Sequence, residues 1–368
     1  MRKEVKMKRS KQSSYLKVIA FVLIAIVIIS ALGFVANGWQ PILYPEASGD
    51  SDSQDSALDG DGNTDIPVAT VPKYYNYLTG LETDESGANR APIAFVTDPQ
   101  KTIYGIGGAS LSVEFPIEGD GSRLLIFTNE ATSLGKIGQI ESTRGYISNL
   151  VRYFGAILLS NGNDDAIKYD SLSITDRHVD LSALSGFHYT EKEIAYSNGD
   201  LLDAALNSLG LSLDLEITPK LPFNFAAPET SMDSLTVPCN RVLIPINSDN
   251  NTELRYNSES GRYTYIKNET PITDALNTSI VEYDNAFILL ADSVTYESAS
   301  GTGLVMKTNE SGRGYYLTEG SYIEIKWVAE GNTMTFYDAN DNKLTVNRGS
   351  SYIAFVKSAR AQLISFTN

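Results

Sequence analysis

The stretch LSVEFPIEGDGSRLLIF, residues 111–127, decides the fold class of this chain. Two apolar runs, 111–115 and 124–128, lie on either side of the glycine- and aspartate-rich residues 118–121. Apolar runs separated by turn-forming residues predict two β-strands with a hairpin tip between them. Three charged residues, Glu114, Glu118 and Arg123, lie on or between these strands.

On either side of this pair, apolar runs alternate with amphipathic segments, which is typical of α/β organisation. The expected strands are 91–96, 111–115, 124–128 and 156–160, and the expected helices are 142–154 and 201–209. A proline-containing stretch at 219–228 follows, and short β-rich runs between residues 241 and 356 then replace the helical pattern. We therefore expect an α+β protein with an N-terminal α/β domain at 73–220 and a mainly antiparallel, β-rich C-terminal domain at 221–368.

The N-terminal segment predicts a membrane anchor. Residues 18–36 carry no charge, and about 20 apolar residues suffice for a helix to cross a bilayer. We expect a basic cytoplasmic tail at 1–17, a transmembrane signal anchor at 18–37, an acidic disordered linker at 38–72, and the rest of the chain outside the cell membrane. A cleaved signal peptide is the alternative, although its apolar region is usually only about 7–15 residues long.

Charge separates the tail from the rest of the chain. Residues 1–17 hold seven basic and one acidic side chain, so the remainder has 22 basic against 44 acidic residues. Nucleic acid is therefore disfavoured as a partner of the expected exported part, since binding it requires neutralisation of phosphates. The single cysteine, Cys239, lies far from the apolar run, which excludes a lipid anchor there, and we expect it to be a small buried side chain.

The sequence contains no established signature of a metal or cofactor site. Its two histidines, His178 and His188, lack the spacing of a zinc site and are expected to lie in loops. The glycines at 105, 107 and 108 lack the third glycine and the lysine of phosphate-binding loops, so a flexible turn is expected there. We expect neither a metal nor a cofactor.

The charged residues of the first stretch offer the best candidate site. Glu114, Glu118 and Arg123, with Arg144 nearby in the chain, could form a cluster of carboxylates and guanidinium groups. They could equally occupy solvent-exposed faces and a hairpin tip. If Glu114 and Glu118 faced one another, they could serve as the acid and base of a cell-wall-active hydrolase or transferase.

Several segments resemble one bacterial family, the YerB-like predicted lipoproteins of Gram-positive bacteria, which are two-domain envelope proteins of unknown function. The resemblance is carried by RAPIAFVTD (90–98), residues 112–127, IGQIESTRGYISNL (137–150), GRGYYLTEGSYIEIKWV (312–328) and TFYDANDNKLTVNRGSSYIAFV (335–356).

The resemblance implies binding positions at Glu114, Glu118, Arg123, Arg144 and Tyr189. Glu141 stands where the family has the first of two arginines, and the chain lacks the lipid-bearing cysteine. The resemblance and the sequence features together favour a non-enzymatic envelope protein that binds a protein or cell-wall component and contacts the membrane through its N-terminal helix.

Overall fold

The computed structural model describes residues 72–162, 176–215, 222–228, 230, 232, 235–298 and 301–368. The predicted tail at 1–17, the anchor at 18–37 and all of the linker except residue 72 lie outside these residues. Among the residues that are described, no helix is both long enough and apolar enough to cross a membrane. Residues Thr70–Asn368 form one compact unit.

The first half of this unit contains short helices among its strands. Its elements are β1 (Tyr74–Tyr75), β2 (Glu82–Thr83), α2 (Glu85–Ala88), β3 (Ile93–Thr97), β4 (Leu111–Pro116), β5 (Ser122–Thr128), η1 (Ala131–Ser133), β6 (Ile137–Ile140), α3 (Ile147–Tyr153), β7 (Ile157–Ser160), β8 (His178–Asp180), β9 (Tyr189–Glu191), β10 (Ile194–Ser197) and α4 (Gly199–Leu209).

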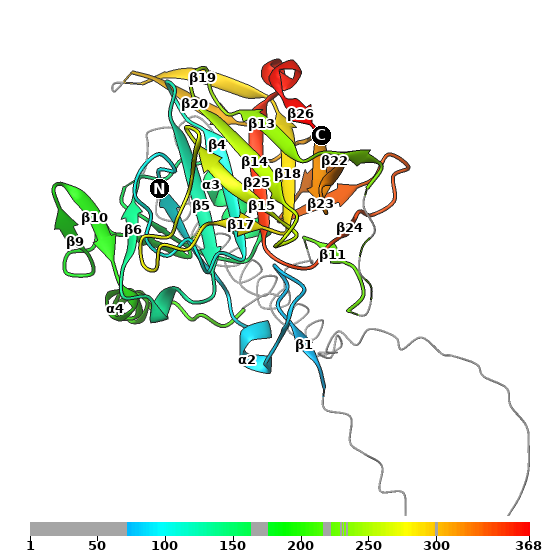
Figure 1. Ribbon diagram of the computed structural model, residues 1–368. Coiled ribbons are helices and arrows are strands. Elements are labelled where there is room, and N and C mark those ends of the chain that lie inside the picture. The colour runs from blue at the N-terminus through cyan, green and yellow to red at the C-terminus, as the bar shows by residue number, and fades with distance from the viewer. Residues whose placement is uncertain are drawn as a thin grey trace, which may run out of the picture. The chain divides into compact units, whose positions relative to one another are not determined.

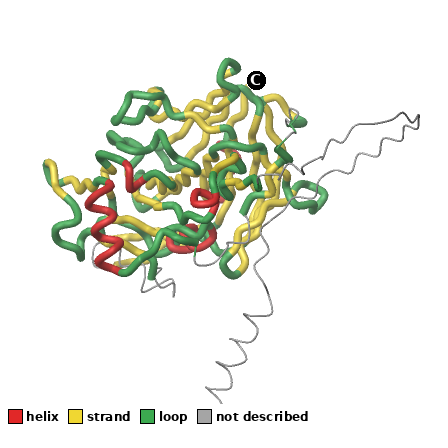
Figure 2. Tube along the Cα trace, turned by 90° about the horizontal axis from the view of Figure 1, so that it is seen from below, coloured by secondary structure: helices red, strands yellow, loops and turns green. Residues whose placement is uncertain are grey.

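The second half consists almost entirely of strands. They are β11 (Asn224–Phe225), β12 (Val237–Pro238), β13 (Arg241–Pro245), β14 (Asn251–Asn257), β15 (Arg262–Lys267), β16 (Thr270–Pro271), β17 (Glu282–Tyr283), β18 (Asn285–Ala291), β19 (Ser293–Ser298), β20 (Gly301–Met306), β21 (Ser311–Thr318), β22 (Ser321–Glu330), β23 (Thr333–Tyr337), β24 (Thr345–Val346), β25 (Ser351–Lys357) and β26 (Ser365–Thr367), with the helical turn η3 (Ser358–Leu363). The described chain is thus mainly β (Figure 2).

An 11-stranded sheet contains strands from both halves. Its main path runs β12-β22-β21-β18-β25-β4-β5-β3-β7-β8, and β23 pairs with β22. Strand β25 lies between β18 and β4 and is parallel to both (Figure 1). Ala354 of β25 is opposite Glu114 of β4. Strands from both sides of the predicted boundary near residue 220 therefore hydrogen-bond to one another within this sheet.

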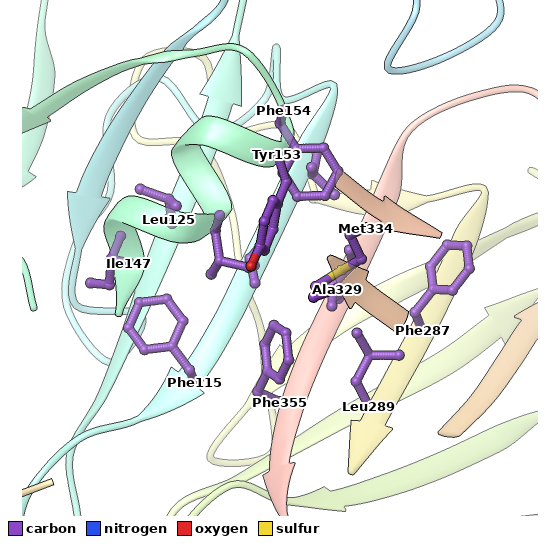
Figure 3. Close-up of a cluster of buried hydrophobic side chains, with 14 of the residues drawn as sticks. Phe115, Leu125, Ile147, Tyr153, Phe154, Phe287, Leu289, Ala329, Met334 and Phe355 are labelled. Atoms are coloured by element: carbon purple, nitrogen blue, oxygen red, sulfur yellow. The ribbon is translucent and has the colours of Figure 1, made fainter. Parts of the chain in front are cut away.

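Each face of this sheet is covered by apolar residues. On one face, helix α3 packs with β4, β5, β18 and β25 in a cluster that includes Phe115, Ile147, Leu289 and Phe355 (Figure 3). On the other face, a second sheet of order β16-β15-β14-β13-β26 contributes Ile244, Leu254 and other residues to a second cluster. Strands β3 and β4 are buried along their whole length because both of their faces are covered.

The predicted elements agree with this fold in position more than in pairing. The four strands expected in the first half correspond to β3, β4, β5 and β7, and the later of the two expected helices corresponds to α4. Helix α3 is shorter than the range 142–154, because residues 142–146 form the connection that enters it. The described C-terminal strands are mainly antiparallel, as expected. The exceptions are β25, whose two neighbours are both parallel to it, and the short parallel pair of β11 and β24.

Candidate functional site

Several strands of the large sheet point in the same direction, so their carboxyl ends lie at the same end of the sheet. Strands β18, β25 and β4 are mutually parallel, and β3, β7 and β8 point the same way because β5, antiparallel to both β4 and β3, lies between them. Open sheets with parallel strands commonly bind ligands beyond the carboxyl ends of those strands. We call the end of the sheet where the carboxyl ends of these strands lie the carboxyl edge.

Glu118 and Arg144 form an ion pair at the carboxyl edge. Glu118 lies in the hairpin after β4, and Arg144 lies in the segment that leads into α3. Arg144 Nε donates to Glu118 Oε2 at 3.2 Å, and Arg144 Nη2 also contacts this carboxylate. Burial opposes ionisation of Glu118, but the hydrogen bond and charge of Arg144 outweigh it and lower the pKa of the carboxyl group. The pair fixes the hairpin against the start of α3.

Arg123 forms a second ion pair beside the first. Its Nη2 donates to Glu141 Oε2 at 3.1 Å, and Lys101 Nζ donates to the other oxygen of Glu141 at 2.9 Å. The backbone places Glu141 between two strands of the edge, because its N–H donates to Val96 and its carbonyl accepts from Asn161. The charge of Arg123 also reaches Glu118, so the two ion pairs are neighbours.

We call Lys101, Glu118, Arg123, Glu141 and Arg144 the edge cluster. The structure thus brings together Glu118, Arg123 and Arg144, which is one of the two arrangements that the sequence left open. Sequence reasoning did not assign Lys101 or Glu141 to the site. The acidic residue at position 141, where the resembling family has arginine, was a usable signal, because a carboxylate there can pair with Arg123.

Glu114 does not belong to the edge cluster. It points toward the second sheet and has no exposed surface, which contradicts a solvent-facing position. Its carboxylate accepts five hydrogen bonds, from Ser122 Oγ (2.8 Å), Thr252 Oγ1 (2.7 Å), Tyr265 OH (3.0 Å), Lys267 Nζ (2.7 Å) and Tyr352 OH (2.7 Å). This carboxylate joins β4 to the second sheet and to β25.

Lys267 is as deeply buried as Glu114 and has a full set of acceptors. Besides Glu114, its ammonium donates to Asn250 Oδ1 at 2.6 Å and to Thr252 Oγ1 at 2.9 Å. Burial raises the pKa of Glu114, but the charge of Lys267 and the surrounding hydrogen bonds outweigh this and lower it overall. Glu114 is therefore a carboxylate held by its neighbours, with the chemistry of a structural ion pair rather than of a proton donor.

Tyr189 lies on strand β9, in the hairpin of β9 and β10 (Figure 1). Its ring stacks on Tyr196 at 5.9 Å, and Tyr104 meets Tyr196 edge-on at the same distance. The ammonium of Lys136 lies 4.0 Å from the ring centre of Tyr196 and 4.5 Å from that of Tyr104, and it also pairs with Glu191 at 2.9 Å. These contacts attach the hairpin to the segment before β6.

His178 does not lie where the sequence predicts, whereas Cys239 does. His178 lies in strand β8 and not in a loop, with its Nε2 2.8 Å from Ser160 Oγ, and burial lowers its pKa. Cys239 is buried, as expected. In the part of the chain that the structure describes, no group of three or more His, Cys, Asp or Glu side chains could hold a metal ion.

The glycine-rich turn at 105–108 binds a carboxylate of the chain itself. The N–H groups of Gly105 and Gly107 donate to the two oxygens of Asp274, at 3.0 and 2.7 Å. A Cβ at position 107 would lie 2.9 Å from one of those oxygens, so glycine allows this close approach. The turn is thus fixed to the second half of the chain by the kind of amide–anion contact that phosphate loops use.

Comparison with known proteins gives the family. A model described as protein of unknown function (DUF3048), N-terminal domain, matches residues 78–212, and the corresponding C-terminal domain matches residues 242–353. The chain belongs to the DUF3048 family. Both domains of DUF3048 are therefore present and in order, and the edge cluster lies within the N-terminal one.

The fold of this DUF3048 protein is similar to that of a solved structure, the crystal structure of the YerB protein from Bacillus subtilis. The two share a TM-score of 0.68 and 19% sequence identity over 80% of this chain and 100% of that one. This confirms the YerB-like resemblance read from the sequence, and at this identity it establishes the fold alone. No curated protein matches the chain.

Proposed function

We propose that the DUF3048 unit is a non-enzymatic binding module that recognises a protein or cell-wall partner through its carboxyl edge. The observation that carries this proposal is the edge cluster, in which basic and acidic side chains from separate segments lie at one end of the sheet. Lys101 and Glu118 keep 44% and 35% of their side-chain surface exposed. Partly exposed ion pairs can exchange partners with the charges of another polar surface, which supports specificity.

The proposed location rests on the N-terminal sequence. The basic residues before the apolar run favour a cytoplasmic N-terminus, and the apolar run is long enough to remain as a single-pass anchor. The acidic, serine- and glycine-rich segment after it suits an extended spacer. In this proposal the binding module lies outside the cell membrane at the end of that spacer.

The alternative, a hydrolase or transferase with paired carboxylates, finds no support in the geometry. Glu114 is enclosed between the two sheets, whereas Glu118 pairs with Arg144 beside α3. The two carboxylates therefore have different partners in different parts of the molecule. Neither has the raised pKa that a general acid near neutral pH requires.

Photo-crosslinking from intact membranes tests the binding proposal. The full-length protein would carry a crosslinking residue at position 98, next to the edge cluster, and adducts would be identified by mass spectrometry. We expect one dominant envelope partner, and Lys101→Glu should reduce its yield at least about tenfold, because it places a like charge beside Glu141. The control is Lys343→Glu, at an exposed lysine far along the chain.

Two results would refute the proposal. One is the release of soluble products when the purified protein is incubated with cell-wall fragments, because a binding module leaves its partner intact. The other is equal crosslinking of the Lys101→Glu and control variants. Protease treatment of intact protoplasts tests the location separately, since the proposal requires the DUF3048 unit to be digested from outside.

A further inference from the structure

A cavity of about 370 Å³ opens at the carboxyl edge, at the ends of β18 and β25. It is lined by Asp292, Ser293, Val294, Lys307, Glu310, Lys357, Ser358 and Ala359. These residues come from the last residue of β25 and the start of η3, from the junction of β18 and β19 and the start of β19, and from the loop between β20 and β21. Ligand sites commonly have volumes of about 300–1,000 Å³, so the cavity suits a small molecule.

Four charged side chains line the cavity: Asp292, Lys307, Glu310 and Lys357. Within the described part of the chain, none of the four forms an ion pair. This differs from the edge cluster, where each charge has an opposite partner. Two ammonium groups and two carboxylates therefore remain available to a bound molecule.

Lys357 is fixed by its contacts with the rest of the edge. Its Nζ donates to Asn247 Oδ1 at 3.0 Å, and the amide of Asn247 donates in turn to the carbonyls of Ile117 and Gly121 in the hairpin after β4. An ammonium has three N–H donors, and among the described residues only Asn247 accepts from this one, so two donors remain for a ligand. Burial and the nearby charge of Arg360 lower the pKa of Lys357, despite the opposing charge of Asp120, so its charge would gain from a bound anion.

The loop that carries Lys307 and Glu310 is also held in place. The backbone N–H of Lys307 donates to the carbonyl of Asp292, and the carbonyl of Glu310 accepts from Ala329. Between them, Thr308 donates to the carbonyl of Tyr146 at 3.1 Å. The opposite charges of the cavity are thus presented by fixed backbone segments.

We propose that this cavity binds an amino acid or short peptide that carries both a free carboxylate and a free ammonium group. The carboxylate pairs with Lys357 and Lys307, and the ammonium pairs with Asp292 and Glu310. A ligand with a single sign of charge leaves one pair without a partner and meets repulsion from it. Val294, which is 49% exposed, offers apolar contact to a ligand side chain. This site goes beyond the macromolecular partner proposed above and does not depend on it.

Calorimetric titration of the full-length protein in lipid nanodiscs tests the site. The probes are alanyl-alanine and its two blocked forms, N-acetyl-alanyl-alanine and alanyl-alanine amide. We expect alanyl-alanine to bind and each blocked form to bind at least about tenfold more weakly, because each lacks one charge. Lys357→Met and Glu310→Gln should each weaken alanyl-alanine binding to a similar extent, whereas Lys343→Met, on an exposed lysine elsewhere, should not.

The outcomes distinguish this site from the binding proposal. Equal affinity for the free and blocked dipeptides, or no heat of binding for the wild type, would overturn the inference even if partner crosslinking succeeded. Failure of crosslinking with retained dipeptide binding would count against the binding proposal alone. Competition between alanyl-alanine and purified cell wall would assign the site to wall-attached peptide, and dipeptide binding without competition would assign it to soluble peptide.

Discussion

Replacement of Glu114 by glutamine is expected to destabilise the protein far more than the loss of one surface charge. The substitution keeps the shape of the side chain but removes its charge. Lys267 would then remain as a buried ammonium with only Asn250 and Thr252 as strong acceptors. The new amide nitrogen would also be placed against donors, because each of the five groups around the carboxylate donates to it at present.

The magnitude follows from the burial of the pair. Removal of one partner of a buried ion pair typically costs about 3–5 kcal/mol, whereas exposed pairs contribute about 0–1 kcal/mol. Glu114 and Lys267 expose 0% and 2% of their surface, which places this pair in the first class. Since domains are stable by only about 5–15 kcal/mol, the variant should lose a large part of its free energy of unfolding.

Urea unfolding followed by far-ultraviolet circular dichroism measures this loss. Glu324→Gln is the matched control, because Glu324 lies exposed on strand β22 and should change the free energy of unfolding by less than about 0.5 kcal/mol. The double variant Glu114→Gln with Lys267→Met should recover part of the loss, since no buried charge remains. A loss below about 1 kcal/mol for Glu114→Gln alone would refute the assignment of Glu114 as a buried structural carboxylate.

Three further predictions follow. Asp274→Asn removes the charge that the amides of the glycine turn bind, so we expect the free energy of unfolding to fall by about 1.5–3 kcal/mol and the amides of residues 103–108 to exchange hydrogen faster. Unchanged hydrogen exchange at these residues would contradict the contact. Because the pKa of Glu118 is lowered from its ordinary value of 4.5 in the folded protein, its charged form stabilises the fold above pH 4.5, and this contribution is lost as the pH falls through the lowered pKa. The urea midpoint should therefore depend less steeply on pH in acid for Glu118→Gln than for the wild type. Identical pH curves for the two proteins would refute this prediction. Lys136→Met removes an ammonium from the tyrosine rings, with an expected cost of about 0.5–1 kcal/mol in thermal unfolding and faster hydrogen exchange in hairpin β9–β10 as its local sign.

The sequence predicts the strands of this protein well because their signal is local. Apolar runs such as 91–96 and 111–115 are buried on both faces and end at turn residues, so their limits are visible without knowledge of their neighbours. Helix α4 is equally local: Asn198 caps its first turn, and Gly210 ends it in the left-handed conformation. The short strands β6, β8, β9 and β10 were not predicted, since three or four residues carry too little pattern.

Pairing and burial of single charges could not be predicted, because they depend on residues far away in the chain. Glu114 is enclosed by Lys267 and Tyr352, which lie more than 150 residues later. A glutamate in an apolar strand can either face solvent or join such a network, and the sequence of the strand does not distinguish the two. The position of Glu141 between Arg123 and Lys101 is likewise a result of the fold.

The position of β25 has a consequence for how the polypeptide can be shortened. This strand is formed by Ser351–Lys357, far beyond β4 along the chain, yet it lies between β18 and β4 in the middle of the sheet. During synthesis from the N-terminus, β4 must wait until residues 351–357 have been made before it acquires this neighbour. A premature stop before residue 351 would therefore remove an interior strand of this sheet, and would leave β18 and β4 with unpaired edges that are prone to aggregation.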